Sequence, residues 1–144
     1  MTGPPRARRV LVCEDSKPYA VALTRFLEKD DQIEVVGVAP SGERAIADVG
    51  RLRPDLLTLD VQLPGMDGLT ATALLKEDPL TAAIPIIALS ALAMKADEEK
   101  SRSAGCDAYI VKPLRYQELY AAMNRLLADG RRAAAVGSAE HDHP

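Results

Sequence analysis

Four short apolar runs, each ending abruptly at a particular polar or charged group, constrain the fold of this 144-residue chain most strongly. Short apolar runs bounded by turn signals are typical of strands that are buried on both faces of a parallel sheet. The carboxyl ends of parallel strands meet at one edge, where open α/β sheets bind their ligands. We therefore expect three carboxylates, a hydroxyl and an ammonium to gather at this edge. The runs and their final groups are 10–13 with Glu14 and Asp15, 56–59 with Asp60, 85–89 with Ser90, and 108–111 with Lys112.

Segments in which apolar residues recur with a helical period separate the strand-like runs. A further strand is predicted over 33–38, and Pro54 ends the helix before the third strand. Short strands that alternate with helical patterns are the signature of βα units. The chain is therefore predicted to be an α/β protein with five βα units and a doubly wound parallel sheet of five strands. The apolar helix positions are Tyr19, Leu23, Phe26 and Leu27; Ala45, Ile46, Val49 and Leu52; a short helix over 69–76; and Leu119, Met123, Leu126 and Leu127 in a helix over 116–127.

The helix predicted after Ser90 has a thin apolar stripe. Between Met94 and Gly105 its only apolar residues are Ala96 and Ala104, and the others are charged or carry a hydroxyl. Helices in proteins draw most of their stability from a packed apolar face. We therefore expect this helix to lie at the low end of the domain's local stabilities.

The two ends of the chain lack a usable apolar period. We predict flexible tails over 1–8 and 129–144 and a single domain over 9–128. The residues at 140–143 are Glu, His, Asp and His, which are metal-ligating types. Without a second ligand cluster to complete a coordination sphere, we do not expect a metal site there.

Composition excludes several classes of protein. The net charge is −3 and no basic stripe occurs, so nucleic acid is not expected as a ligand. No apolar stretch approaches the ~20 residues of a membrane span, and none forms a signal peptide, so we expect a cytoplasmic protein that does not enter a membrane. The spacing of Cys13 and Cys106 favours two reduced thiols over a disulfide.

Three carboxylates at one sheet edge repel one another unless a cation neutralises the group. Carboxylates are hard oxygen ligands of the kind that Mg²⁺ prefers, and Mg²⁺ keeps coordination positions for water and phosphate oxygens. The ammonium of Lys112 and the hydroxyl of Ser90 are suited to hold the remaining phosphoryl oxygens. A carboxylate in such a site can act as a nucleophile and form an aspartyl phosphate.

In this order and at these strand ends, the residues resemble those of the receiver domain of two-component response regulators, over about 9–127. Each motif by itself is weak, whereas the set is highly specific. The resemblance implies a flavodoxin-like fold with strand order 2-1-3-4-5 and a ligand site at its topological switch point. The motifs are Glu14-Asp15, Asp60-Val61-Gln62-Leu63-Pro64-Gly65-Met66-Asp67-Gly68, Leu89-Ser90-Ala91 and Tyr109-Ile110-Val111-Lys112-Pro113.

The resemblance also implies roles for the acidic groups. By this resemblance Asp60 is the phosphoacceptor. Asp15, Asp60 and the backbone carbonyl of Gln62 would bind Mg²⁺, with Glu14 acting largely through water. The chain departs from the family pattern at Gln62 and at Leu92, positions that the family uses to tune the access of hydrolytic water.

Three further residues belong to the switch by the same resemblance. Ser90 is the hydroxyl that turns toward the phosphoryl group, and Tyr109 is the aromatic side chain that swings inward behind it. Lys112 is the partner of the phosphate and the carboxylates, and the Lys112-Pro113 peptide bond is expected to be cis. The change is expected to reach a face made by the fourth helix, the fifth strand and the fifth helix.

The resulting prediction is a stand-alone receiver that accepts a phosphoryl group on Asp60 from a histidine kinase or a histidine phosphotransfer protein. Such a chain is not an enzyme acting on other substrates, because it catalyses only its own phosphorylation and slow dephosphorylation. Its output is expected to be contact with a downstream protein through the face named above. A homodimer of the phosphorylated form is left open.

Two other functions are alternatives at this point. A phosphatase of the haloacid dehalogenase type also uses a strand-end aspartate and Mg²⁺, but its D-x-D pattern requires a second aspartate where this chain has Gln62. A receiver fold that has lost phosphorylation and serves as a docking scaffold is disfavoured by the intact acid set of Glu14, Asp15 and Asp60.

Overall fold

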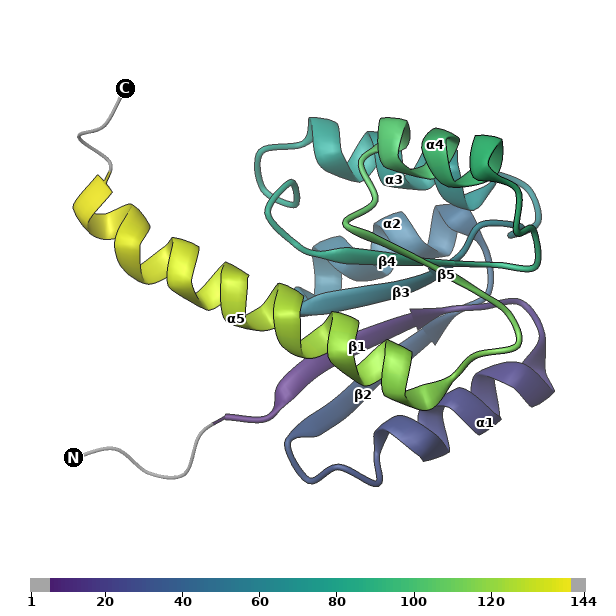
Figure 1. Ribbon diagram of the computed structural model, residues 1–144, viewed down its shortest axis with the longest axis horizontal. Coiled ribbons are helices and arrows are strands. Elements are labelled where there is room, and N and C mark those ends of the chain that lie inside the picture. Colours follow the sequence, from purple (N-terminus) through teal and green to yellow (C-terminus); the bar gives the residue numbers. More distant parts are fainter. Residues whose placement is uncertain (1–5, 141–144) are drawn as a thin grey trace.

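The computed structural model describes residues 6–140, and over 129–140 it describes the helical backbone. Strands form one parallel sheet in the order β2-β1-β3-β4-β5, with a helix after each strand (Figure 1). The fold class and strand order predicted from the sequence are therefore confirmed. The elements are β1 (Arg8–Cys13), α1 (Lys17–Leu27), β2 (Ile33–Ala39), α2 (Gly42–Leu52), β3 (Leu56–Asp60), α3 (Gly68–Glu77), β4 (Ile86–Ser90), α4 (Lys95–Ala104), β5 (Ala108–Val111) and α5 (Tyr116–Glu140).

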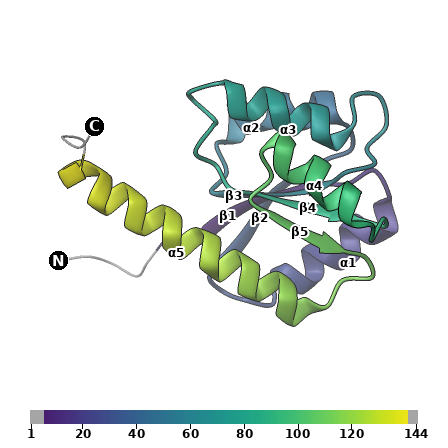
Figure 2. The ribbon, with the colours of Figure 1, turned by 45° about the horizontal axis from the view of Figure 1, so that its top comes forward.

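Helices cover both faces of the sheet. α1 and α5 lie against one face, and α2, α3 and α4 lie on the other (Figures 1 and 2). Every residue of β3 and of β4, two strands inside the sheet, is buried. Burial on both faces explains why these strands appear in the sequence as nearly continuous apolar runs rather than as alternating patterns.

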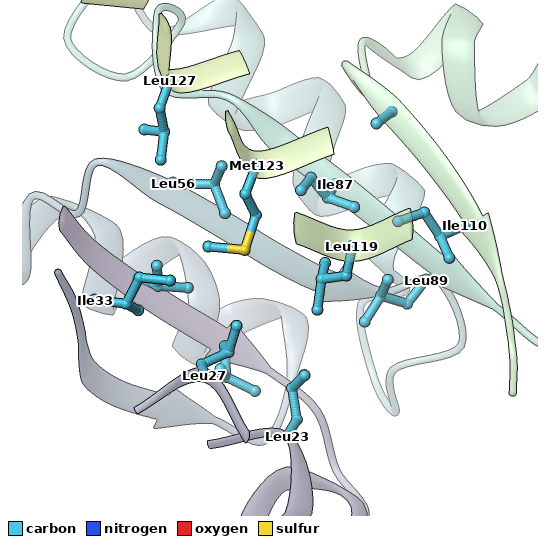
Figure 3. Close-up of a cluster of buried hydrophobic side chains, with 13 residues drawn as sticks. Leu23, Leu27, Ile33, Leu56, Ile87, Leu89, Ile110, Leu119, Met123 and Leu127 are labelled. Atoms are coloured by element: carbon cyan, nitrogen blue, oxygen red, sulfur yellow. The ribbon is translucent and has the colours of Figure 1, made fainter. Parts of the chain in front are cut away.

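One layer of the core lies between the sheet and helices α1 and α5 (Figure 3). Leu23 and Leu27 of α1 belong to one buried cluster with Leu119 and Met123 of α5 and with strand residues. Burial of each such side chain contributes about 1.5–3 kcal/mol. These two helices are therefore well anchored to the strands whose ends carry the polar groups.

α4 is anchored much more weakly than the other helices. Its buried residue is Ser101. None of its side chains belongs to the buried cluster between the sheet and helices α2 and α3, which lie on the same face as α4. Met94, at the start of α4, is 68% exposed and provides no side-chain cap. The thin apolar stripe predicted for this helix is thus observed, while its low local stability stays a prediction.

Two local sequence features allow helices to start directly after the strand ends at the carboxyl edge of the sheet. The Ser16 hydroxyl caps α1 by accepting a hydrogen bond from the Tyr19 backbone N–H at 3.4 Å. At Gly68, the first residue of α3, a Cβ atom would lie 2.5 Å from the Asp60 carbonyl oxygen. Glycine therefore allows the start of α3 to pack directly on the end of β3.

α5 is longer than the sequence pattern predicted. The helix continues to Glu140, whereas the apolar period ends at Leu127, and its distal part extends past the sheet (Figures 1 and 2). Residues 133–135 are all alanine, the strongest intrinsic helix former, which explains a helix without an apolar period. Despite the length of α5, no helix in the described part of the chain is long and apolar enough to cross a membrane.

The ends of the chain differ from the sequence-based expectation in two places. β1 begins at Arg8, inside the tail predicted over 1–8, and residues 129–140 are helical where a tail was predicted. Residues 1–5 and 141–144, with His141 and His143, lie outside the described residues. The domain limits of 9–128 stay a prediction.

Candidate functional site

The groups that the sequence placed at one sheet edge lie together in the structure. Glu14 and Asp15 follow β1 and Asp60 ends β3, and oxygen atoms of the three carboxylates lie within 4.8 Å of one another. Ser90 ends β4, and Lys112 directly follows β5. The convergence expected from parallel strands is therefore observed.

The Lys112 ammonium lies between two of these carboxylates. Its Nζ atom is 3.0 Å from Glu14 Oε1 and 3.3 Å from Asp60 Oδ2. The side chains of Glu14 and Asp60 are 3% and 7% exposed, and that of Lys112 is 18% exposed. Water screens these contacts weakly, so both ion pairs are stronger than a pair on the open surface.

Burial and neighbouring charges shift the pKa values of this cluster. Burial raises the pKa of the Glu14 carboxyl, and Asp60 adds to the rise, while the Lys112 ammonium and the Ser16 backbone N–H oppose it. Burial alone would lower the pKa of Lys112, but the hydrogen bond to Glu14 and the charge of Asp60 raise it overall. Lys112 therefore remains protonated at neutral pH, whereas a charged Glu14 is disfavoured by its surroundings.

Backbone contacts orient the Asp60 carboxylate. The Gln62 backbone N–H donates to Asp60 Oδ1 at 2.9 Å, while Oδ2 faces Lys112. Just beyond the strand, the Val61 N–H donates to the Leu89 carbonyl of β4 at 2.9 Å. The two oxygens of Asp60 thus have different partners, which fixes the plane of the carboxylate.

The three carboxylates can hold a divalent cation. Glu14 and Asp60 are buried, whereas Asp15 is exposed and opens the group to solvent. Three negative charges and the positive charge of Lys112 leave two negative charges, which one divalent cation would neutralise. Hard oxygen ligands with access to water fit the coordination that Mg²⁺ requires.

Ser90 and Tyr109, both assigned to the switch from the sequence, bond to the backbone of the same residue. The buried Ser90 hydroxyl accepts a hydrogen bond from the Leu92 backbone N–H at 3.0 Å. The Tyr109 hydroxyl donates to the Leu92 carbonyl. The two side chains therefore come from adjacent strands, β4 and β5, and meet at one point of the segment before α4. The Lys112-Pro113 peptide bond is cis, as expected.

Tyr19 is a member of the site that the sequence analysis missed. The Lys112 Nζ atom lies 4.2 Å from the centroid of the Tyr19 ring. Burial raises the pKa of the Tyr19 phenol, so the ring that faces the ammonium is neutral. The sequence offered one signal, the place of Tyr19 in the first helical turn after Asp15, but its apolar spacing was interpreted as a core position.

Comparison with known proteins identifies the family to which the sequence is similar. The family model of the response regulator receiver domain matches residues 10–124. The chain is 46% identical over 122 residues to the polar-differentiation response regulator DivK of Brucella anthropi, covering 85% of this chain and 98% of that protein. It is 45% identical over 108 residues to a protein-glutamate methylesterase/protein-glutamine glutaminase of Syntrophus aciditrophicus, covering 73% of this chain and 30% of that protein.

Solved structures have the same fold. A putative response regulator from Chloroflexus aurantiacus matches with a TM-score of 0.79 and 32% identity, over 85% of this chain and 99% of that chain. A chain of the CheX–CheY–BeF3–Mg²⁺ complex from Borrelia burgdorferi matches with a TM-score of 0.75 and 25% identity, over 82% and 87% of the two chains. The family match spans every residue of the acid cluster and Lys112. The resemblance carried by the strand-end motifs is thus confirmed, and the chain belongs to the receiver-domain family of two-component response regulators.

Proposed function

We propose that this chain accepts a phosphoryl group on Asp60 from the phosphohistidine of a histidine kinase or of a histidine phosphotransfer protein. The observation that carries the proposal is the environment of Asp60. Its carboxylate shares the Lys112 ammonium with Glu14 and lies within 4.8 Å of two further carboxylates. A carboxylate that served only as a turn or cap residue would have no need of this buried charge cluster.

In the transfer step, an Asp60 oxygen attacks the phosphorus atom, and the phosphorus–nitrogen bond to the donor imidazole breaks. The electron pair of that bond leaves with the imidazole, which takes up a proton, and Asp60 becomes an acyl phosphate. Because Asp60 Oδ2 faces Lys112, the ammonium is near the site of attack. It can therefore donate a hydrogen bond to one of the oxygens of the transferred group.

Asp15, Asp60 and the Gln62 backbone carbonyl would hold Mg²⁺, with Glu14 acting through water. The bound ion would offset the negative charges of the nucleophile and of the phosphoryl oxygens. The chain itself orients Asp60 through the Gln62 N–H and holds Lys112 through Glu14. These groups are in place before a donor arrives, so little reorganisation is needed during the transfer.

We further propose that the segment before α4 transmits the signal. If the Ser90 hydroxyl turns toward a phosphoryl oxygen, its hydrogen bond from the Leu92 N–H is lost. The Leu92 carbonyl is bonded to Tyr109, so this change reaches the side chain on β5 as well. α4, with Ser101 as its buried residue, offers little resistance to movement. The surface of α4, β5 and α5 would then bind a downstream protein.

Phosphorylation from a small donor tests the proposal. The protein is incubated with Mg²⁺ and acetyl phosphate, and its intact mass is measured before and after treatment with base. We expect the wild type to gain one base-labile phosphoryl group and Asp60→Asn to gain none. Asp67→Asn is a matched control, because Asp67 lies in the loop that follows Asp60 and caps α3, and asparagine caps a helix as well as aspartate does.

The possible outcomes separate the proposed function from its alternatives. If the wild type gains no mass, the result would favour the alternative function, a receiver fold that serves only as a docking scaffold. A gain of mass by Asp60→Asn would show that another residue is the acceptor. Rapid hydrolysis of diverse phosphate esters would favour the phosphatase, in which the exposed Gln62 would have to replace an aspartate.

A further inference from the structure

The Lys112 ammonium has an aromatic neighbour in addition to its two carboxylate partners. Its Nζ atom is 3.0 Å from Glu14 Oε1, 3.3 Å from Asp60 Oδ2 and 4.2 Å from the centroid of the Tyr19 ring. An ammonium within about 6 Å of a ring centroid is attracted by the negative face of the ring. This attraction is larger where water is excluded, and Lys112 is 18% exposed.

The ring of Tyr19, rather than its hydroxyl, accounts for this position. The hydroxyl oxygen is buried and has no hydrogen-bond partner among the described residues. Since the hydroxyl makes no hydrogen bond within the described part of the chain, the ring is the part of the side chain that can attract the Lys112 ammonium. The backbone of Tyr19 is fixed by the Ser16 cap, which holds the ring in the first turn of α1 beside Lys112.

An additional contact is useful to Lys112 because a lysine side chain does not by itself hold its ammonium in one place. Its ammonium is a point charge on a flexible stem of four carbons, which loses considerable rotamer freedom when it is held. In the proposed transfer the ammonium must also exchange an Asp60 oxygen for a phosphoryl oxygen. The Tyr19 ring attracts the charge without donating or accepting a hydrogen bond, so this contact can persist while the oxygen partner changes.

We propose that Tyr19 is a positioning residue, which holds the Lys112 ammonium at the acid cluster before and during phosphoryl transfer. This inference rests on the proposed function of Asp60 for its effect on rate. The contact itself does not depend on that function. Tyr19 acts through Lys112 and has no direct contact with the acceptor in this scheme.

The contact is tested first by NMR of the unphosphorylated protein. Protons next to the face of an aromatic ring are shifted upfield, so the ε-methylene signals of Lys112 should lie upfield of those of exposed lysines. Tyr19→Leu should abolish this shift and Tyr19→Phe should retain it. Phe26→Leu is the matched control, because it removes another α1 ring, which stacks on Tyr116 at a centroid distance of 3.5 Å. It should leave the Lys112 shift in place.

The role is tested by the rate of phosphorylation with acetyl phosphate and Mg²⁺. Tyr19→Leu should be about threefold to tenfold slower than the wild type, and Tyr19→Phe should restore most of the rate. A circular dichroism melt verifies that each variant is folded. Equal rates for Tyr19→Leu and the wild type would overturn the inference, as would a Tyr19→Phe variant that is as slow as Tyr19→Leu. If the wild type takes up no phosphoryl group, the proposed function and the rate effect both fail, while the NMR shift still decides the contact.

Discussion

Replacing Lys112 by methionine removes the charge shared by Glu14 and Asp60 and keeps a stem of similar length. At an effective dielectric constant of about 20, each ion pair at 3.0 and 3.3 Å contributes about 5 kcal/mol of attraction. The carboxylates lie within 4.8 Å of each other, so their repulsion, at least about 3.5 kcal/mol, is present in both proteins but is no longer offset by a positive charge in the variant. Methionine avoids the desolvation cost of lysine, which offsets part of the loss. We expect the free energy of unfolding to fall by about 3 kcal/mol at neutral pH without divalent cations.

The loss should shrink in acid because Glu14 can take up a proton. Burial raises the Glu14 pKa in the folded protein, and removal of the Lys112 hydrogen bond, which lowers that pKa, raises it further. A carboxyl group whose pKa is raised by folding stabilises the folded state below its unfolded pKa of about 4.3, and this contribution is lost as the pH rises through the folded pKa. Lys112→Met should therefore recover stability relative to the wild type as the pH falls from about 7 toward about 4.5.

Urea unfolding followed by circular dichroism, in EDTA at about pH 7.5 and about pH 5, measures this effect. A double-mutant cycle with Glu14→Gln isolates the contribution of the ion pair. In the Glu14→Gln background, Lys112→Met should cost less at neutral pH and should lose most of its pH dependence. An equal cost at both pH values, or in both backgrounds, would refute the ion-pair reasoning.

Three other predictions follow from the same structure. Mg²⁺ should raise the melting temperature of the wild type, EDTA should reverse the rise, and Asp15→Asn should weaken it, because an ion that binds only the folded state stabilises it by mass action. Cys13 and Cys106 are free, as the sequence analysis expected, and both are buried, which is the chief cause of their raised thiol pKa values. They should react with a thiol reagent at mildly alkaline pH only after unfolding. Leu119→Ala, in the core, should cost about 2–5 kcal/mol in urea unfolding, whereas Leu80→Ala, at a site 78% exposed, should change stability by less than about 0.5 kcal/mol.

The sheet and the acid cluster could be predicted because they obey a local rule. A strand buried on both faces is apolar along most of its length, with Thr58 the one exception inside β3, so the polar group that ends the apolar run marks the end of the strand. Asp60 and Ser90 end β3 and β4 in this way, and the parallel arrangement brings such ends together.

Two features escaped the sequence because they depend on other information. The contact of Tyr19 with Lys112 joins positions far apart in the chain, and the rotation of α1 that creates it follows from packing against the sheet. The extension of α5 to Glu140 has no apolar period, so a prediction based on amphipathic spacing ends at the last packed turn, near Leu127. Intrinsic propensity, which spacing does not measure, continues the helix.

Leu92 illustrates how a residue can join two side chains through its main chain alone. Its side chain is 43% exposed, yet its N–H is bonded to Ser90 and its carbonyl to Tyr109. An alanine scan would leave both bonds intact and would therefore not test them. An amide-to-ester exchange that replaces the Leu92 N–H by oxygen would instead release the Ser90 hydroxyl without altering any side chain. The effect of the Ser90 bond could then be measured while the Leu92 carbonyl is still available to Tyr109.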